Sequence, residues 1–255
     1  MEGIRVLDVA PPPADQRLHY GADSNQFLDL RMPKAVGAVP LVFYIHGGFW
    51  RARYDLTHGG WPCSALAATG FATCNVEYRR AGSPRGAWPA SLQDIRAAWQ
   101  FLSRSGARYR YDLGRAIVMG HSAGGQLALA FAAHQPAIMR VVSLAGVLDL
   151  RRAWELHLSN DAVVEFLGGT PEQAPEHYRE ADPMQLKLAA RQAIVCGSGD
   201  TIVPPDFSRH YVEHKRSQQQ PAELIEIRGA DHFALIDPQS PAWPQVVAVA
   251  KALLA

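Results

Sequence analysis

A five-residue motif around Ser122 is the part of this sequence that most clearly carries chemistry. It reads Gly120-His121-Ser122-Ala123-Gly124 and stands between an apolar run, residues 116–119, and a stretch of small residues typical of a helix. A G-x-S-x-G between a strand and a helix is typical of a nucleophile elbow, a tight turn that strains the serine backbone and exposes its hydroxyl. Glycines flank the serine because a Cβ there would collide with neighbouring backbone. The motif therefore predicts that Ser122 is a nucleophile.

Two later segments supply the base and the acid that a serine nucleophile requires. A hydroxyl is a weak nucleophile at neutral pH, so it needs a base, which a carboxylate holds and stabilises. Asp200 ends a glycine-rich turn after the apolar run at 193–197, and His232 lies in the loop after the apolar run at 223–227. Both positions follow predicted strands, at the sheet edge where Ser122 is also expected.

Other assignments of these two roles are open in the sequence. Asp231 is adjacent to His232, but side chains of adjacent residues on an extended segment diverge, so it cannot easily hold the ring. Asp206 is a closer rival to Asp200, although it falls in the predicted helix after the turn. Each residue also has a non-catalytic interpretation when it is considered alone. Asp200 could simply be a turn residue, and His232 could be a capping or surface histidine. Together with Ser122, they favour a catalytic triad.

A glycine-rich segment can stabilise the negative charge that attack by a serine creates. It reads His46-Gly47-Gly48-Phe49-Trp50 and follows the predicted strand at 41–46. The oxyanion of a tetrahedral intermediate needs preorganised N–H donors, which a motif of this type and the residue after the nucleophile provide. We therefore predict an oxyanion hole made by the amides of Gly48, Phe49 and Ala123. The alternative is a simple tight glycine turn.

Strand-like and helix-like segments alternate along the chain and place these motifs. Strands are predicted at 27–31, 41–46, 71–77, 116–119, 141–144, 193–197 and 223–227, and helices at 57–69, 90–103, 122–134, 205–216 and 241–254. Repeated β-α-β units with continuously apolar strands predict a mainly parallel sheet covered by helices on both faces. The expected fold class is therefore α/β, with a central sheet of about eight strands.

Residues 148–191 interrupt this alternation. They are polar, contain Trp154 and several glycines and prolines, and have no clear strand. A stretch of this length is too long for an unstructured loop in a compact domain. We predict a small helical cap over the carboxyl ends of the strands, where open α/β sheets place their sites. The 255 residues are then one domain, residues 1–255, with the cap as an insertion.

Composition excludes several classes of function. The formal net charge is +1 and the basic clusters are short and scattered, which argues against nucleic acid as a partner. No apolar stretch approaches the roughly 18 residues that would span a bilayer. Residues 1–16 lack the apolar region of a signal peptide. We expect a cytoplasmic protein without a membrane partner, as a monomer or a homodimer.

The sequence also gives no sign of a cofactor or a metal. The three cysteines are dispersed, form no CxxC pair and suit buried thiols rather than a disulfide framework. His210 and His214 are four residues apart on a predicted helix, but they lack the glutamate of an H-E-x-x-H zinc motif. No glycine-rich nucleotide motif follows a strand. We therefore expect no cofactor and no metal.

Short motifs spread over nearly the whole chain carry a family resemblance. They are Tyr20-Gly21, Leu28-Asp29-Leu30, His46-Gly47-Gly48-Phe49-Trp50, Glu77-Tyr78-Arg79-Arg80, Trp88-Pro89, Asp94, Gly120-His121-Ser122-Ala123-Gly124-Gly125, Gly199-Asp200, Val203-Pro204 and Asp231-His232-Phe233. Together they resemble the α/β-hydrolases of the hormone-sensitive-lipase-like group. The resemblance is closer to its branch with an HGGxW motif, which includes kynurenine formamidase (arylformamidase) and related bacterial carboxylesterases.

This resemblance implies a role for each matching residue. Ser122 would be the nucleophile, His232 the general base and Asp200 the residue that orients it, in the chain order of α/β-hydrolases. His46 and Trp50 would shape and fix the oxyanion loop. Three residues near the nucleophile are also candidates for substrate contact: Phe49, Trp50 and His121.

The resemblance also implies a substrate class, a small-molecule ester or amide. Phe49 stands where the hormone-sensitive-lipase pattern has a third glycine, so its side chain is expected to narrow the acyl side of the pocket. With the short cap, this favours a carboxylesterase for small acyl groups that works through an acyl-enzyme on Ser122. An arylformamidase is the alternative, and transfer to an alcohol or a peroxide is a variant of the same chemistry. A non-catalytic ligand-binding protein on a hydrolase scaffold is a more distant alternative.

Overall fold

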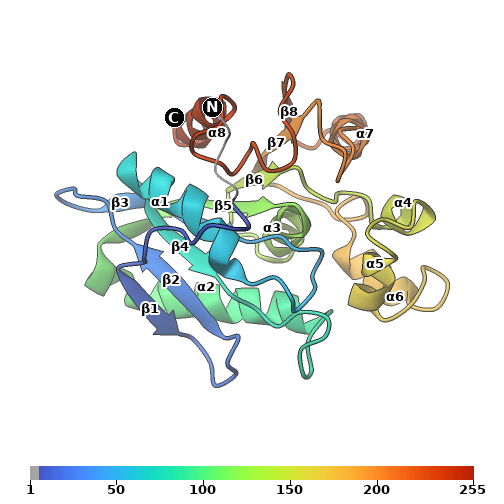
Figure 1. Cartoon of the computed structure of the whole chain (residues 1–255), viewed down its shortest axis with the longest axis horizontal. Helices are drawn as coiled ribbons and strands as arrows, with labels where there is room; N and C mark the ends of the chain where they lie inside the picture. The colour runs from blue at the N-terminus through green and yellow to red at the C-terminus, as the bar shows by residue number, and fades with distance from the viewer. Residues whose placement is uncertain (1–5) are drawn as a thin grey trace.

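The computed structural model of this protein describes residues 6–255, apart from the side chain of Ala107. One eight-stranded sheet runs through its centre, in the order β1-β2-β4-β3-β5-β6-β7-β8 (Figure 1). The strands are β1 (Gln16–His19), β2 (Phe27–Arg31), β3 (Val39–Ile45), β4 (Ala72–Val76), β5 (Tyr111–His121), β6 (Arg140–Leu144), β7 (Arg191–Gly197) and β8 (Ala222–Ile227). The first five residues of the segment predicted to lack a signal region lie outside the described range.

The sheet is mainly parallel, as the sequence predicted. β1 pairs antiparallel with β2, and β2 antiparallel with β4. All further pairs, from β4–β3 to β7–β8, are parallel. Strands joined by helical crossovers must run parallel, and their carboxyl ends meet at one edge of the sheet.

Helices cover both faces of the sheet. They are η1 (Leu56–Gly59, a 3₁₀ turn), α1 (Gly60–Ala68), α2 (Ala90–Tyr109), α3 (Ala123–His134), α4 (Leu150–Glu155), α5 (Ala162–Leu167), α6 (Pro175–Ala181), α7 (Asp206–Ser217) and α8 (Trp243–Ala252). Side chains of β3 alternate between two apolar cores, because successive residues of a strand point to opposite faces. Phe43 belongs to the same core cluster as apolar side chains of α2, α3 and α7, whereas Tyr44 belongs to the cluster that contains those of α1 and α8.

The described structure differs from the predicted elements mainly in four places. Helix α2 continues to Tyr109, six residues beyond its predicted end at 103. The exposed edge strand β1 was not predicted, because its sequence QRLH offers only one apolar residue. The predicted helix at 57–69 is a 3₁₀ turn followed by α1. Strand β5 begins five residues earlier than predicted, at Tyr111, because its first half is polar and partly exposed and therefore lacks an apolar pattern.

Between β6 and β7, residues 148–191 contain the three short helices α4, α5 and α6. They lie together beyond the end of α3 in the view of Figure 1. Their apolar side chains, including Phe166 and Tyr178, belong to the same core cluster as the side chains of α2 and α3. The segment is therefore packed as part of the α/β body.

Candidate active site

Ser122 occupies a sharp turn between β5 and α3. Its φ of 55° and ψ of −122° form a backbone conformation that side-chain-bearing residues rarely adopt. The flanking glycines are required by close backbone approach. A Cβ on Gly120 would lie 2.0 Å from the carbonyl oxygen of Gly124, and one on Gly124 would lie 2.1 Å from that of Ile45. The local sequence thus accounts for the strained turn of a nucleophile elbow.

Asp200 and His232 meet at the same edge of the sheet. The imidazole Nδ1 lies 2.7 Å from Asp200 Oδ2, and both side chains are buried. The other carboxylate oxygen, Oδ1, accepts hydrogen bonds from the amides of Ile202 at 2.8 Å and Val203 at 2.9 Å. Because a carboxylate can only accept, Nδ1 carries the proton and leaves Nε2 as the basic nitrogen.

The two rival carboxylates have other partners. Asp231 Oδ1 accepts hydrogen bonds from the amides of Phe233 and Ala234, so it closes the turn after His232. Asp206, in α7, pairs with Arg209 at the surface. Of the three candidate acids, Asp200 is therefore the one that holds the His232 ring.

Ser122 and His232 line one cavity of about 120 Å³. Its other lining residues are Leu7, Gly48, Phe49, Tyr54, His58, His121, Ile202 and Phe233. In the described part of the chain, no hydrogen bond joins the Ser122 hydroxyl to the His232 ring. Such contacts often tighten only when substrate binds. The predicted nucleophile and base therefore face the same small space.

The predicted oxyanion loop has the backbone shape that its role requires. Gly48, Phe49 and Trp50 have φ values of 107°, 49° and 56°, so three successive residues are in the left-handed region. Within residues 6–255, the amides of Gly48 and Phe49 donate no hydrogen bond to the protein. Ala123 begins α3, where the first amides of a helix have no intrahelical acceptor. All three predicted donors are thus available to a ligand.

A buried ionic network supports this loop from behind. His46 Nε2 lies 3.1 Å from Glu77 Oε1, and the His46 ring stacks on Tyr78 at a centroid distance of 4.6 Å. Glu77 also pairs with the guanidinium of Arg80 and accepts a hydrogen bond from the amide of Leu56 at 2.9 Å. His46 is fully buried and does not line the cavity, so its contacts fix the loop rather than touch substrate.

Trp50 does not contact the catalytic cavity, contrary to its prediction as a substrate-binding residue. Its ring stacks on Phe166 with centroids 4.7 Å apart, and its Nε1–H donates to Gln126 at 2.9 Å. Only 1% of Trp50 is exposed. An indole that is buried and hydrogen-bonded in this way anchors the oxyanion loop to the cap and to α3. The family resemblance implied that Trp50 fixes the loop, but the sequence could not reveal its partners, because they lie 76 and 116 residues away.

The other two predicted contact residues, Phe49 and His121, do line the cavity. His121 Nε2 lies 3.0 Å from the carbonyl oxygen of His232 and therefore donates its proton there. Burial, with a smaller contribution from His232, lowers the pKa of His121 well below its usual value. Its neutral ring thus holds the backbone that carries the base.

Four cavity residues had no signal in the sequence: the apolar Leu7 and Ile202 and the polar Tyr54 and His58. Tyr54 and His58 follow the oxyanion loop, in a segment without a recognisable motif, and both face the cavity. Only the proximity of that segment to the HGGxW motif could have drawn attention to them. Burial lowers the pKa of His58 to about 3, so its ring is neutral.

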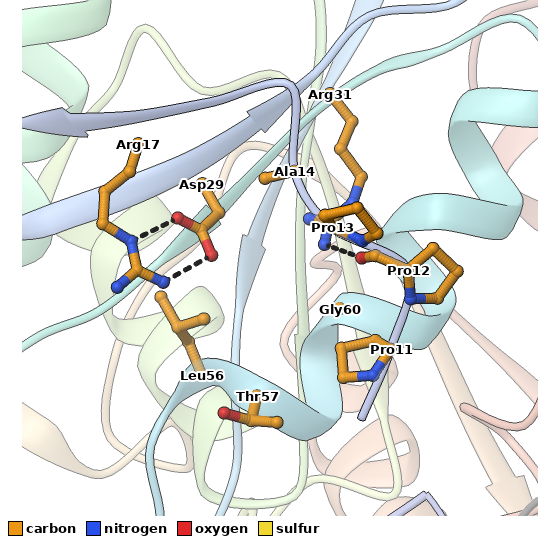
Figure 2. Close-up of a pocket in the computed structure, with 10 residues that line it drawn as sticks. All are labelled: Pro11, Pro12, Pro13, Ala14, Arg17, Asp29, Arg31, Leu56, Thr57 and Gly60. Carbon is orange, nitrogen blue, oxygen red and sulfur yellow. Dashed lines mark hydrogen bonds and ion pairs between the residues drawn. The ribbon is translucent and has the colours of Figure 1, made fainter. Parts of the chain in front are cut away.

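A larger cavity of about 330 Å³ lies beneath the proline segment near the N-terminus (Figure 2). The Arg17 guanidinium makes two hydrogen bonds to Asp29 there, at 2.8 and 2.9 Å, and Arg31 Nη2 donates to the carbonyl oxygen of Pro12 at 2.9 Å. Among the described residues, its lining offers the hydroxyl of Thr57 and the carboxylate of Asp29 but no histidine that could act as a base. This cavity therefore lacks a nucleophile paired with a histidine base.

Among the described residues, no group of three or more His, Cys, Asp or Glu side chains could hold a metal ion. The His210 and His214 pair is engaged elsewhere, because His210 contacts Arg152 and His214 lies 3.0 Å from the Met184 carbonyl oxygen. In the same part of the chain, no helix is both long and apolar enough to cross a membrane.

Comparison with known proteins gives the family context of this geometry. The profile of the BD-FAE family matches residues 28–214, more than half of the chain. Esterase LipC of Mycobacterium tuberculosis (strain ATCC 25618 / H37Rv) is 28% identical over 249 residues, covering 87% of this chain and 60% of LipC. Kynurenine formamidase of Salmo salar is 24% identical over 230 residues, covering 86% of this chain and 74% of the formamidase.

Solved structures share the fold. A truncated carbohydrate esterase from gut microbiota superimposes with a TM-score of 0.81 at 19% identity, covering 96% of this chain and 99% of the other. Esterase B from Lactobacillus rhamnosis gives a TM-score of 0.79 at 19% identity, covering 96% of this chain and 88% of the other. At this level of identity the similarity establishes the α/β-hydrolase fold, as the sequence motifs predicted.

Proposed function

Because the chain belongs to the BD-FAE family of α/β-hydrolases, we propose that it is a serine carboxylesterase for small acyl groups. One observation carries the proposal. Ser122, the Asp200-bound His232 ring and the free amides of Gly48 and Phe49 surround one cavity of about 120 Å³. The names of relatives such as esterase LipC support the same activity, although the chain spans only 60% of that relative.

The first half of the reaction forms an acyl-enzyme. His232 Nε2 takes the proton of the Ser122 hydroxyl as the serine oxygen attacks the ester carbonyl. Asp200 keeps the ring in the required tautomer through the 2.7 Å bond to Nδ1. The amides of Gly48, Phe49 and Ala123 stabilise the oxyanion. When the intermediate collapses, the alcohol leaves with the proton from His232.

The second half returns the enzyme to its starting state. His232 Nε2 accepts a proton from water, whose oxygen attacks the acyl carbon bound to Ser122. The same amides stabilise the second oxyanion. Collapse releases the carboxylic acid, and the proton on His232 returns to the serine oxygen. The cycle uses no group beyond these side chains, backbone amides and water.

The size of the cavity sets the expected acyl group. Its volume is about 120 Å³. Phe49, Ile202 and Phe233 supply apolar walls. Acetyl, propionyl and butyryl groups fit such a space without rearrangement, whereas an octanoyl chain does not.

Steady-state hydrolysis of p-nitrophenyl acetate, butyrate and octanoate tests this function. We expect kcat/KM to be highest for acetate or butyrate, and Ser122→Ala to abolish both turnover and labelling by a fluorophosphonate probe. Ser103→Ala is a matched control, because that hydroxyl lies on α2 and donates to the Trp99 carbonyl. Full activity of the Ser122→Ala variant would refute the assignment.

Aryl-formamide hydrolysis is the second candidate. Two relatives named kynurenine formamidase, from Salmo salar and Danio rerio, are covered over 74% of their length. A formyl group is the smallest acyl group, so the narrow cavity accepts it, and the same Ser122 and His232 chemistry applies. A kcat/KM for N-formyl-kynurenine far above that of every p-nitrophenyl ester would establish this candidate and displace the carboxylesterase.

A further inference from the structure

The catalytic cavity contains a polar side chain that the proposed reaction does not use. His58, in the 3₁₀ turn η1, lines the cavity together with Ser122 and His232. It is 6% exposed. Among residues 6–255, neither nitrogen of its ring has a hydrogen-bond partner. Neither nitrogen is fully buried. A molecule that covers them without offering a hydrogen bond would leave buried polar atoms unpaired, which is uncommon in proteins.

The position of His58 shows why its nitrogens have no partner within the protein. Its ring meets the His46 ring edge to face, with centroids 5.7 Å apart and an interplanar angle of 89°. His46 uses both of its own nitrogens for Gly47 and Glu77. The cavity on the other side has mainly apolar walls, which include Phe49, Ile202 and Phe233. Within residues 6–255, no polar side chain of this lining makes a hydrogen bond to His58, so a molecule in the cavity can supply the partner.

His58 is not a second base for the reaction. Burial is the main reason that its pKa falls to about 3, and His46 lowers it further against the opposing effect of Asp55. A base this weak would contribute little near neutral pH. A neutral imidazole instead presents one N–H donor and one acceptor nitrogen. It can therefore pair with a hydroxyl group, which also donates and accepts.

We propose that His58 makes the site selective for esters that carry a hydroxyl group close to the ester bond. The inference rests on the proposed esterase function and adds a substrate class to it. The cavity holds only a few atoms, so the hydroxyl belongs on a short 2-hydroxyacyl group or on the near end of a polyol alcohol. An ester with an apolar group at that position leaves the buried imidazole unpaired, and a site built this way discriminates against it.

Two pairs of esters of matched shape test the proposal and distinguish the two sources of the hydroxyl. The acyl pair is ethyl 2-hydroxypropanoate and ethyl 2-methylpropanoate, and the alcohol pair is 2-hydroxyethyl butanoate and propyl butanoate. Hydrolysis is followed by pH-stat, and each kcat/KM is divided by the rate constant for hydroxide-catalysed hydrolysis. We expect the hydroxy ester to be favoured about tenfold in one pair, the size of one net hydrogen bond.

Two variants show whether His58 is the cause of this preference. His58→Phe keeps a ring but removes both polar atoms, so the ratio within the selective pair should fall to about one. His58→Gln keeps a donor and an acceptor and should retain part of the preference, about threefold. Because the measured quantity is a ratio of two substrates on one protein, partial loss of folded enzyme does not change it.

The possible negative results distinguish a failure of the His58 proposal from a failure of the proposed esterase function. Equal use of both esters in both pairs by the unaltered protein would overturn the role of His58, and so would an unchanged preference in His58→Phe. The proposed function itself fails if none of the four esters is hydrolysed and the fluorophosphonate probe does not label Ser122. The ratio should also stay constant from pH 6 to pH 9, because a neutral imidazole does not titrate there. A ratio that changes across this range would contradict the proposal.

Discussion

The cavity at Ser122 and the cavity at Arg17 and Asp29 contrast in size and in chemistry. The larger one, about 330 Å³, contains two arginines and an aspartate, and the charged groups of Arg17 and Asp29 are bound to each other. The smaller one, about 120 Å³, has a serine hydroxyl, the Nε2 of an oriented histidine and two backbone amides that donate to no acceptor within residues 6–255. Reactivity therefore depends on uncommitted polar groups held in place by committed neighbours, and not on volume or charge alone.

The contacts that support the two cavities also differ in how well they are buried and paired. Behind the catalytic cavity, Glu77, Arg80 and His46 are buried and bound to one another, so the oxyanion loop has a rigid base. At the larger cavity the Arg17 side chain is 53% exposed. Two guanidinium nitrogens of Arg31, Nε and Nη1, are buried and have no hydrogen-bond partner among the residues that the structure describes. Four changes test this contrast.

Ser122→Ala should have the largest effect. It removes the nucleophile while the elbow retains its backbone, so kcat/KM for p-nitrophenyl butyrate should fall by at least about 10⁴-fold. Circular dichroism and Tm should stay close to those of the unaltered protein. If activity fell only a few-fold, the smaller cavity would not be the reaction site, and the proposed difference in reactivity between the two cavities would be wrong.

Asp200→Asn should follow, with a loss of about 10³- to 10⁴-fold, mainly in kcat. An asparagine amide can still accept from the Ile202 and Val203 amides, but it presents an N–H to His232 Nδ1. The ring then adopts the other tautomer and Nε2 can no longer accept the serine proton. Asp206→Asn is the control, because that carboxylate pairs with Arg209 at the surface. A similar loss in both variants would indicate that Asp200 has no special role.

Glu77→Gln should act first on stability. It leaves Arg80, which is 3% exposed, as a buried charge without a carboxylate. Breaking such a pair costs about 3 kcal/mol, and Tm should fall by about 10 °C. Glu165→Gln removes a half-exposed partner of Arg51 and should cost less than about 1 kcal/mol. The Tm values of both variants are compared by thermal unfolding. Equal decreases in Tm would contradict the view that the Glu77 network is a rigid base for the oxyanion loop.

Arg31→Met, at the larger cavity, should have the smallest effect. Replacing a buried charge that has unsatisfied donors by an apolar side chain of similar length is commonly neutral or stabilising. We expect an unfolding free energy within about 1 kcal/mol of the original value or higher, measured by urea titration. Ester hydrolysis should stay within about twofold. A large loss of activity would show that the two cavities are coupled through η1, which contributes residues to both.

Much of the architecture was readable from local patterns. Seven of the strands and the helices around them are apolar segments of the right length and order, since a buried strand or helix face must be apolar wherever it occurs. The exposed strand β1 was not predicted, because half-exposed edge strands do not have a continuous apolar pattern. The three triad candidates could be located for a related reason. The nucleophile elbow, the turn that carries the acid and the loop that carries the histidine each need particular residue types directly after a strand. Those residue types can be recognised in the sequence.

Other properties depend on residues distant in sequence. The motif defined Ser122, Asp200 and His232 as candidates, but only folding excluded Asp206 and Asp231, because hydrogen-bond partners are set by position in space. Trp50 belongs to the same short motif as Phe49, yet its ring turns away from the cavity to meet Phe166 and Gln126. His58 had no sequence signal and became part of the site when η1 packed beside the oxyanion loop. Local sequence dictates which chemistry is available, whereas tertiary packing decides which side chains share the space in which it occurs.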